Sequence, residues 1–246
     1  MIISHTHRFV FNKPMKTAGS SLEVCLYGHL GDGDVVGNNG AENLKRLRSH
    51  GTNVQVRDAS HVAMADLVRG YDWKCIGYTH FTVVRNPWDR AVSLFYWRNP
   101  EYREAPLRKA RAEFQRWVGF GLRELENSSY SWMGYPIADV VLKYETLDQG
   151  IRVLSHDLAL AEEVDMGAHR DKAGLRPDYS RSFTELYDEA SWSLVGLVLA
   201  ADVALFGYGR DRPSGDLDLL KRFEGVAEPR RRHLKLEHDK AAKAGD

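Results

Sequence analysis

The sequence predicts a single α/β domain in which a parallel β-sheet is flanked by helices. Three apolar runs rich in β-branched and aromatic residues, at 8–12, 80–85 and 138–144, each precede a segment with helical periodicity. Strand followed by helix, repeated along a chain, is the pattern of a parallel sheet covered by helices. A length of 246 residues favours one large domain with a substantial core over two smaller ones.

The helical segments are identified by their periodic apolar spacing and by their boundaries. We expect helices at 20–30, 61–69, 87–98, 103–119, 148–160 and 184–205. Pro87 suits a first helical turn, because the N–H that proline lacks would be unpaired there. The glycine- and asparagine-rich stretch 31–40 is expected to be a loop.

The domain is predicted to span residues 1–213. Residues 214–246 lose apolar periodicity and become charged. They are therefore expected to form an appendage, with a possible amphipathic helix around 217–223 and then a helix or a frayed tail.

Composition excludes several classes of function. Lys and Arg number 34, as do Asp and Glu, so the chain has no overall basic character with which to gather nucleic acid. Apolar runs fall short of the roughly 20 residues of a membrane span, and the N-terminus lacks a signal-peptide pattern, so a cytoplasmic protein is expected. Cys25 and Cys75 lie in apolar contexts and are expected to be core residues, neither disulfide-forming nor metal-binding.

The stretch KPMKTAGSSL, residues 13–22, has the features of an anion-binding turn between a strand and a helix. Helix N-terminal amides attract anions, Gly19 permits close backbone approach, and Lys16 adds a positive charge. The stretch is not a Walker A motif, because Lys16 precedes Gly19 instead of following it. Taken alone, an ordinary N-capped turn explains this stretch equally well.

A second stretch, VVRNPWDRAVSLFYW at residues 83–97, places Arg85 at the exit of a strand and Ser93 in the following helix. An arginine fork and a hydroxyl can together hold a second phosphate. Ser93 alone would more simply be a core hydroxyl bonded to the preceding turn.

These two stretches, in this order, resemble the 5′-phosphosulfate and 3′-phosphate loops of sulfotransferases that use 3′-phosphoadenosine-5′-phosphosulfate (PAPS). The chain is most similar to the carbohydrate-type branch, which includes uronosyl 2-O-, chondroitin and dermatan sulfotransferases and many bacterial relatives. Residues 58–68, 139–147 and 179–208 also fit, so the resemblance covers about residues 8–208. It implies a P-loop-like α/β fold.

The resemblance also implies a role for each residue of the two loops. Lys16 matches the catalytic lysine that contacts the oxygen bridging sulfate and phosphate, and Arg85 and Ser93 match the pair that holds the 3′-phosphate. The other expected nucleotide contacts are Lys13, Thr17, Ala18, Gly19, Ser20, Ser21, Lys172 and Arg176, the last two from a basic segment that closes over the nucleotide.

His61 occupies the position of a catalytic base in relatives of the 2-O-sulfotransferase type. A neutral imidazole can take the proton of an acceptor hydroxyl near pH 7. A histidine capped by Asp58 or Ser60 at the start of a helix is the alternative. Tyr130, Trp132 and Tyr135 fall where relatives line the acceptor site, although buried aromatic residues more often belong to a core.

The resemblance thus implies an enzyme that transfers a sulfuryl group from PAPS to a hydroxyl of a glycan or small molecule. The product nucleotide would be 3′-phosphoadenosine-5′-phosphate (PAP), and no metal is expected. Two alternatives stay open: an ATP-dependent kinase on a P-loop-like fold, and a catalytically silent nucleotide-binding protein. The kinase would need a Mg²⁺-binding carboxylate and a Walker A lysine.

Overall fold

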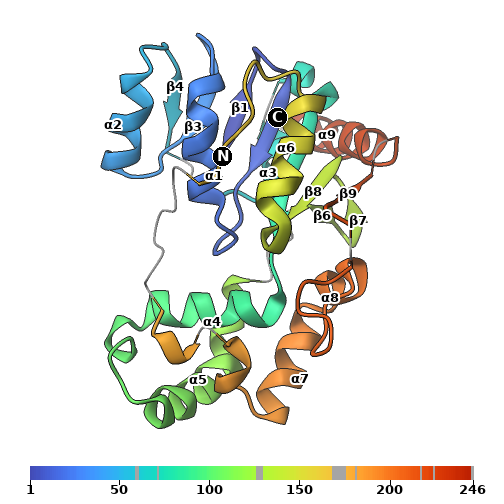
Figure 1. Cartoon of the computed structure of the whole chain (residues 1–246). Helices are drawn as coiled ribbons and strands as arrows, with labels where there is room; N and C mark the ends of the chain where they lie inside the picture. Colours follow the sequence, from blue (N-terminus) through green and yellow to red (C-terminus); the bar gives the residue numbers. More distant parts are fainter. Residues whose placement is uncertain are drawn as a thin grey trace.

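The three apolar runs predicted as strands form the centre of the sheet in a computed structural model of the chain. The structure describes residues 1–58, 61–70, 72–125, 130–167, 176–180, 182–216, 218–223 and 225–244. The main sheet has seven strands in the order β4-β3-β1-β2-β5-β8-β9, and β6 and β7 form a separate two-stranded sheet (Figure 1). The strands are β1 (Ile2–Ser4), β2 (Phe9–Asn12), β3 (Val35–Gly37), β4 (Gln55–Arg57), β5 (Thr79–Val84), β6 (Ser131–Trp132), β7 (Tyr135–Pro136), β8 (Val140–Lys143) and β9 (Leu220–Arg222).

The central strands β2, β5 and β8 are neighbours and run parallel, as expected from the sequence. β3 and β4 also pair in parallel, whereas β1 and β9 run antiparallel to their neighbours. The parallel sheet flanked by helices is therefore confirmed as the fold class, with two antiparallel strands that the sequence did not reveal.

Helices cover both faces of the sheet. They are α1 (Gly19–Leu26), α2 (Ala41–Ser49), α3 (Met64–Gly70), α4 (Pro87–Arg98), α5 (Leu107–Gly121), α6 (Leu147–Asp157), α7 (Glu189–Val198), α8 (Ala200–Phe206) and α9 (Ala227–Ala244). In Figure 1, α4, α5, α7 and α8 gather below the sheet, while α1, α2 and α6 lie beside its strands. Pro87 occupies the first turn of α4, and Asn86 caps that helix by accepting from the Trp88 and Asp89 amides.

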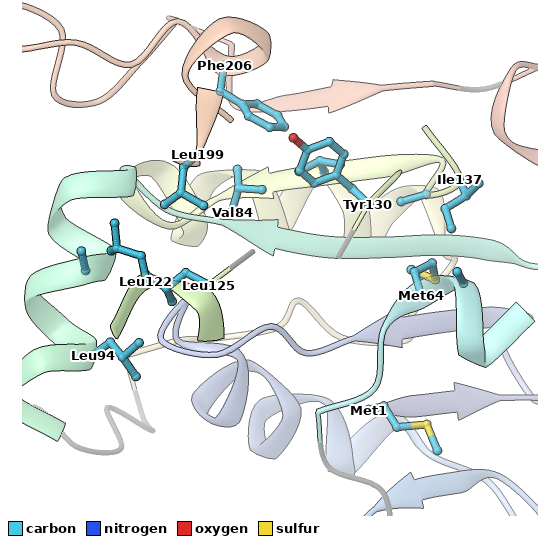
Figure 2. Packing of buried hydrophobic residues seen from close by; sticks show 14 of the residues in the cluster. Met1, Met64, Val84, Leu94, Leu122, Leu125, Tyr130, Ile137, Leu199 and Phe206 are labelled. Carbon is cyan, nitrogen blue, oxygen red and sulfur yellow. The ribbon is translucent and has the colours of Figure 1, made fainter. Parts of the chain in front are cut away.

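Alternation along the strands divides the core into two layers. In β2, Phe9 and Phe11 pack with α1, α2 and α6, whereas Val10 packs in the other layer with α3, α4 and α5. Strands buried on both faces consist mostly of apolar residues, and for this reason they were visible in the sequence. Figure 2 shows part of the second layer, including Met64 and Leu94.

The expected helix at 184–205 is divided. It forms α7 and α8, which meet at Leu199 with an angle of 81° between them. Within the described residues, no single helix is long and apolar enough to cross a membrane; this bent pair passes only when its two parts are taken together.

The C-terminal segment is joined to the domain by a strand and a helix. The helix considered around 217–223 is not found, because residues 220–222 form β9 against β8. α9 follows and packs against α3. Its Arg231 is buried at 1% exposure, lies 3.0 Å from Asp139 Oδ2, and donates to the Ile76 and Ile137 carbonyls. The segment thus contributes to the core.

Candidate active site

A cavity of about 600 Å³ lies where β2, β5 and β8 end, at the edge to which parallel strands direct their carboxyl ends. Cavities of this size are typical of small-molecule sites. Eight of the residues expected in a site line it together: Lys16, Ala18, Gly19, Ser20, Ser21, His61, Arg85 and Ser93. The structure therefore brings the two quoted loops and His61 to one space.

The loop between β2 and α1 has an unusual backbone. Lys16 and Ala18 both have a φ of 63°, in the left-handed region that non-glycine residues rarely adopt. Such residues cost on the order of 1–3 kcal/mol each, so surrounding contacts must hold them. α1 begins directly after Ala18, which gives it no side-chain cap. No capping side chain therefore occupies the backbone N–H groups of the first turn of α1. This end of the helix lies at the cavity, where an anion can bind these N–H groups.

Arg85 connects the second loop to the first. Its Nε and Nη2 lie 2.7 and 2.6 Å from Asp89 Oδ2, and its Nη1 donates to the Lys16 carbonyl at 3.1 Å. The guanidinium carbon also lies 4.1 Å from the centre of the Tyr144 ring. These contacts use one hydrogen on each terminal nitrogen, so each can still offer a second N–H to an anion. Ser93, on α4, lines the same cavity.

Asp89 joins Arg85 to Arg176. Arg176 Nη1 lies 2.5 Å from Asp89 Oδ1, and its Nη2 donates to the Ser180 carbonyl. Burial by itself would raise the pKa of Asp89, but the two guanidiniums outweigh burial and hold that pKa below its ordinary value. Arg176 is not among the cavity-lining residues, so it supports Arg85 through Asp89. Lys172, the other residue expected from this segment, lies outside the described residues.

His61 is oriented by the backbone. Its Nδ1 lies 2.9 Å from the Lys13 carbonyl oxygen, which can only accept, so Nδ1 carries the proton. Nε2 of the neutral ring therefore has the free lone pair that a base requires. Burial lowers the pKa of His61 below its ordinary value, against a smaller opposite effect of this hydrogen bond. The ring is thus held neutral near pH 7, at the edge of the cavity.

Lys13 and Thr17 are positioned differently from the expectation. The Lys13 ammonium is buried behind the loop, 2.6 Å from Glu23 Oε2 and 2.8 Å from Asn39 Oδ1. The Thr17 hydroxyl is also buried and donates to the Pro14 carbonyl at 3.2 Å. Neither residue lines the cavity. Their side chains therefore support the loop from within and do not reach the cavity, which corrects any expected side-chain contact with the nucleotide.

Gly19 is required for packing as well as for backbone approach. A Cβ at this position would lie 2.4 Å from Cγ of Lys13, which is much too close. The glycine therefore lets the buried Lys13–Glu23 ion pair pack directly beneath the start of α1. This reason was not apparent from the motif.

The three aromatic residues expected at an acceptor site do not line the cavity. Tyr130 is buried, donates to Asp202 Oδ1 at 2.7 Å, and packs edge-on against Phe206 with ring centres 5.4 Å apart (Figure 2). Trp132 packs against the core, and Tyr135 is exposed beneath the guanidinium of Arg230. The expectation is corrected for Tyr130 and Trp132, whose side chains pack in or against the core, while contact of the exposed Tyr135 with an acceptor stays a prediction.

Two other aromatic residues line the cavity and were missed. Trp97, on the last turn of α4, has the Lys16 Nζ 5.6 Å from its ring centre. Tyr144 directly follows β8 and stacks with Arg85. Trp97 ends the stretch 83–97, and Tyr144 lies in residues 139–147, which also fit the family resemblance. The rule that sites form at the carboxyl ends of parallel strands could have identified Tyr144.

Glu145 also lines the cavity, but both of its oxygens are engaged. Oε1 accepts from the Asn86 amide at 2.7 Å and Oε2 from the Tyr208 hydroxyl at 2.9 Å. Burial raises the pKa of this carboxyl. Oε1 therefore anchors the start of α4, and Oε2 holds the Tyr208 hydroxyl.

Comparison with known proteins agrees with this geometry. A family model described as "Sulfotransferase family" matches residues 1–209, a range that contains every cavity-lining residue. No curated protein and no solved structure matches the chain significantly. A match over most of the chain is sufficient to assign the family, and the chain belongs to the sulfotransferase family.

Proposed function

We propose that this transferase moves a sulfuryl group from PAPS to a hydroxyl group of a glycan or small molecule, in the manner of the carbohydrate-type branch. The observation that carries the proposal is that two groups suited to bind anions line one cavity. The start of α1 with Lys16 would provide the first anion-binding position, and Arg85 with Ser93 would provide the second. A donor with a 3′-phosphate needs both positions, whereas ATP has no group for the second.

The residues present fit such a donor. Lys16, Gly19, Ser20 and Ser21 would surround the 5′-phosphosulfate, with helix amides and the lysine charge offsetting its negative charge. Arg85 would offer its remaining N–H groups to the 3′-phosphate. The donor supplies an activated sulfuryl group whose leaving group is the 5′-phosphate of PAP.

The transfer would follow from the arrangement of Lys16 and His61. The acceptor oxygen forms a bond to sulfur as the bond from sulfur to the phosphate oxygen breaks, and the departing phosphate keeps that electron pair. Lys16 would stabilise the charge that develops on this phosphate. Nε2 of His61 would take the acceptor's hydroxyl proton.

The acceptor is expected to enter beside Trp97. This ring is 37% exposed and lies on the cavity next to the Lys16 ammonium. An exposed aromatic face at the reacting end suits a sugar ring or another flat, partly apolar acceptor. A glycan or glycosylated metabolite is therefore favoured.

The proposal is tested by incubating purified protein and sulfur-labelled PAPS with extracts of the native cells, and identifying labelled products by mass spectrometry. A labelled product that forms only with the active protein is expected. A boiled sample and the Lys16→Ala variant serve as controls. Phosphate transfer from labelled ATP under the same conditions would instead favour the kinase alternative, and absence of both products would favour the silent nucleotide-binding protein.

A further inference from the structure

Two consecutive carbonyls of the strained loop are each held by an arginine. The Met15 carbonyl accepts from Arg90 Nε at 2.9 Å, and the Lys16 carbonyl accepts from Arg85 Nη1 at 3.1 Å. Both arginines come from the unit formed by β5 and α4, across the cavity edge from the loop. The peptide on either side of Lys16 is thus fixed by charged donors.

Arg90 differs from Arg85 because it has no place on the cavity. It is 3% exposed, and it is absent from the residues that line the site. Arg90 Nη1 lies 3.9 Å from Asp202 Oδ2. The Tyr130 hydroxyl donates to the other oxygen of that carboxylate, Oδ1, at 2.7 Å. A buried row therefore runs from Tyr130 through Asp202 and Arg90 to the Met15 carbonyl.

We propose that Arg90 is a positioning residue for Lys16, and that Asp202 and the Tyr130 hydroxyl keep its guanidinium directed at the Met15 carbonyl. The inference rests on the role proposed for Lys16 in sulfuryl transfer. It assigns a purpose to a buried ion pair whose own residues do not line the cavity.

The backbone conformation gives the physical reason. Lys16 has a φ of 63°, which the chain adopts only where neighbouring contacts enforce it. Releasing the Met15 carbonyl would let the peptide before Lys16 rotate toward ordinary backbone geometry, and the lysine side chain would move with it. Displacement of about 1 Å at a reacting group can cost roughly a hundredfold in rate.

Arginine is suited to this role by its shape. The planar guanidinium presents Nε to the carbonyl while a terminal nitrogen faces Asp202. A lysine retains the charge that Asp202 requires, but a single ammonium cannot meet both partners with the same geometry. Arg90→Lys is therefore a change that keeps the buried charge paired and loosens the loop.

The test is a double-mutant cycle on the purified full-length protein, with Arg90→Lys, Lys16→Ala and both together. Arg90→Lys alone is expected to lower kcat roughly tenfold to a hundredfold with little change in acceptor KM. In the Lys16→Ala background, Arg90→Lys should lower kcat by less than about twofold, because the effects of substitutions in residues that act as a unit are not additive. Tyr130→Phe should show a smaller loss of the same kind. Arg116→Lys, at an exposed ion pair on α5, is the control.

A second measurement does not depend on activity. In amide hydrogen exchange without ligand, Arg90→Lys should speed exchange in peptides covering residues 13–22 roughly tenfold, and leave β8 unchanged. The Leu22 amide, which donates to the Ala18 carbonyl at 3.1 Å, lies within that range.

The outcomes separate the two proposals. The role of Arg90 would be overturned if Arg90→Lys lowered kcat by the same factor with Lys16 present as with Lys16→Ala. It would also be overturned if Arg90→Lys left hydrogen exchange in residues 13–22 unchanged. If the wild-type protein transferred no sulfuryl group, the proposed function would be refuted. Faster exchange in residues 13–22 of Arg90→Lys would even then support the role of Arg90 in holding the loop.

Discussion

Arg85 provides a sharp test of donor recognition, because one substitution should alter the response to a single phosphate. In Arg85→Met the side-chain stem remains and the guanidinium is lost. PAP and AMP both have a 5′-phosphate, but only PAP has the 3′-phosphate proposed to lie against Arg85. The ratio of their dissociation constants therefore isolates the second anion position.

The magnitude follows from the contacts of Arg85. A hydrogen bond to a charged group contributes about 1.5–3 kcal/mol, which corresponds to roughly tenfold to a hundredfold in affinity. Arg85 also holds the Lys16 carbonyl, and loss of that bond should weaken the loop proposed to bind the 5′-phosphate, equally for both nucleotides. Because this second effect is shared, it cancels in the ratio. The preference for PAP over AMP should therefore fall roughly tenfold to a hundredfold.

The assay is isothermal titration calorimetry of both nucleotides at one fixed ionic strength, since charge contacts are weakened by salt. Arg116→Met, which removes an exposed guanidinium on α5, is the matched control and should keep the wild-type ratio. A wild-type ratio in Arg85→Met would show that Arg85 does not bind the 3′-phosphate. Equal affinity of the wild-type protein for PAP and AMP would refute the second anion position itself.

Three further outcomes are expected. His61→Ala should lower turnover roughly a hundredfold. The wild-type rate should fall as pH drops through the His61 pKa, which burial holds below its ordinary 6.5. This acid limb of the pH profile should vanish in His61→Ala; an unchanged limb would show that another group takes the acceptor's proton. Activity should survive EDTA, measured as transfer of labelled sulfate, because lysine and amides provide the charge compensation; complete loss restored by Mg²⁺ would favour the kinase. Arg231→Met should lower the free energy of unfolding in urea by about 3–5 kcal/mol, since Asp139 stays buried without its ion-pair partner. Arg232→Met, at an exposed pair, should cost less than about 1 kcal/mol, and equal costs would contradict the buried role of Arg231.

The centre of the fold could be predicted because its strands are apolar on both faces. β2, β5 and β8 produce uninterrupted apolar runs, and α4 has a proline and an asparagine cap at its start. β1, β3 and β4 have only three residues each, and β4 is exposed throughout, so no periodic pattern marks it. Such short strands are recognised only once their neighbours in the sheet are in place.

The C-terminal segment shows the limit of charge as a guide to exposure. Charged residues are normally at the surface, so 214–246 was expected to be an appendage. Arg231 is buried because Asp139 and the carbonyls of Ile76, Tyr78 and Ile137, all distant in sequence, satisfy its guanidinium. Partners so far apart cannot be read from local sequence.

Residues of the candidate site could be predicted where a sequence motif specifies them. They could not be predicted where tertiary packing decides whether a side chain lies in the cavity or in the core. The loops containing Lys16 and Arg85 meet at one cavity because strands β2 and β5 are parallel neighbours. Tyr130 was misassigned because the sequence does not show that Asp202 receives its hydroxyl. Trp97 was overlooked because an aromatic residue at the end of a helix resembles any other core residue.

The most direct measurement compares sulfuryl transfer and PAP binding in wild-type protein and Lys16→Ala, with an acceptor identified from the labelled extract. We expect kcat to fall roughly a hundredfold to a thousandfold, the range for removing one charge-stabilising donor, while the PAP dissociation constant rises less than about tenfold. Such a split would place Lys16 at the departing phosphate of the transfer step. Full activity in Lys16→Ala would contradict the assignment of the loop between β2 and α1 as the site of sulfuryl transfer.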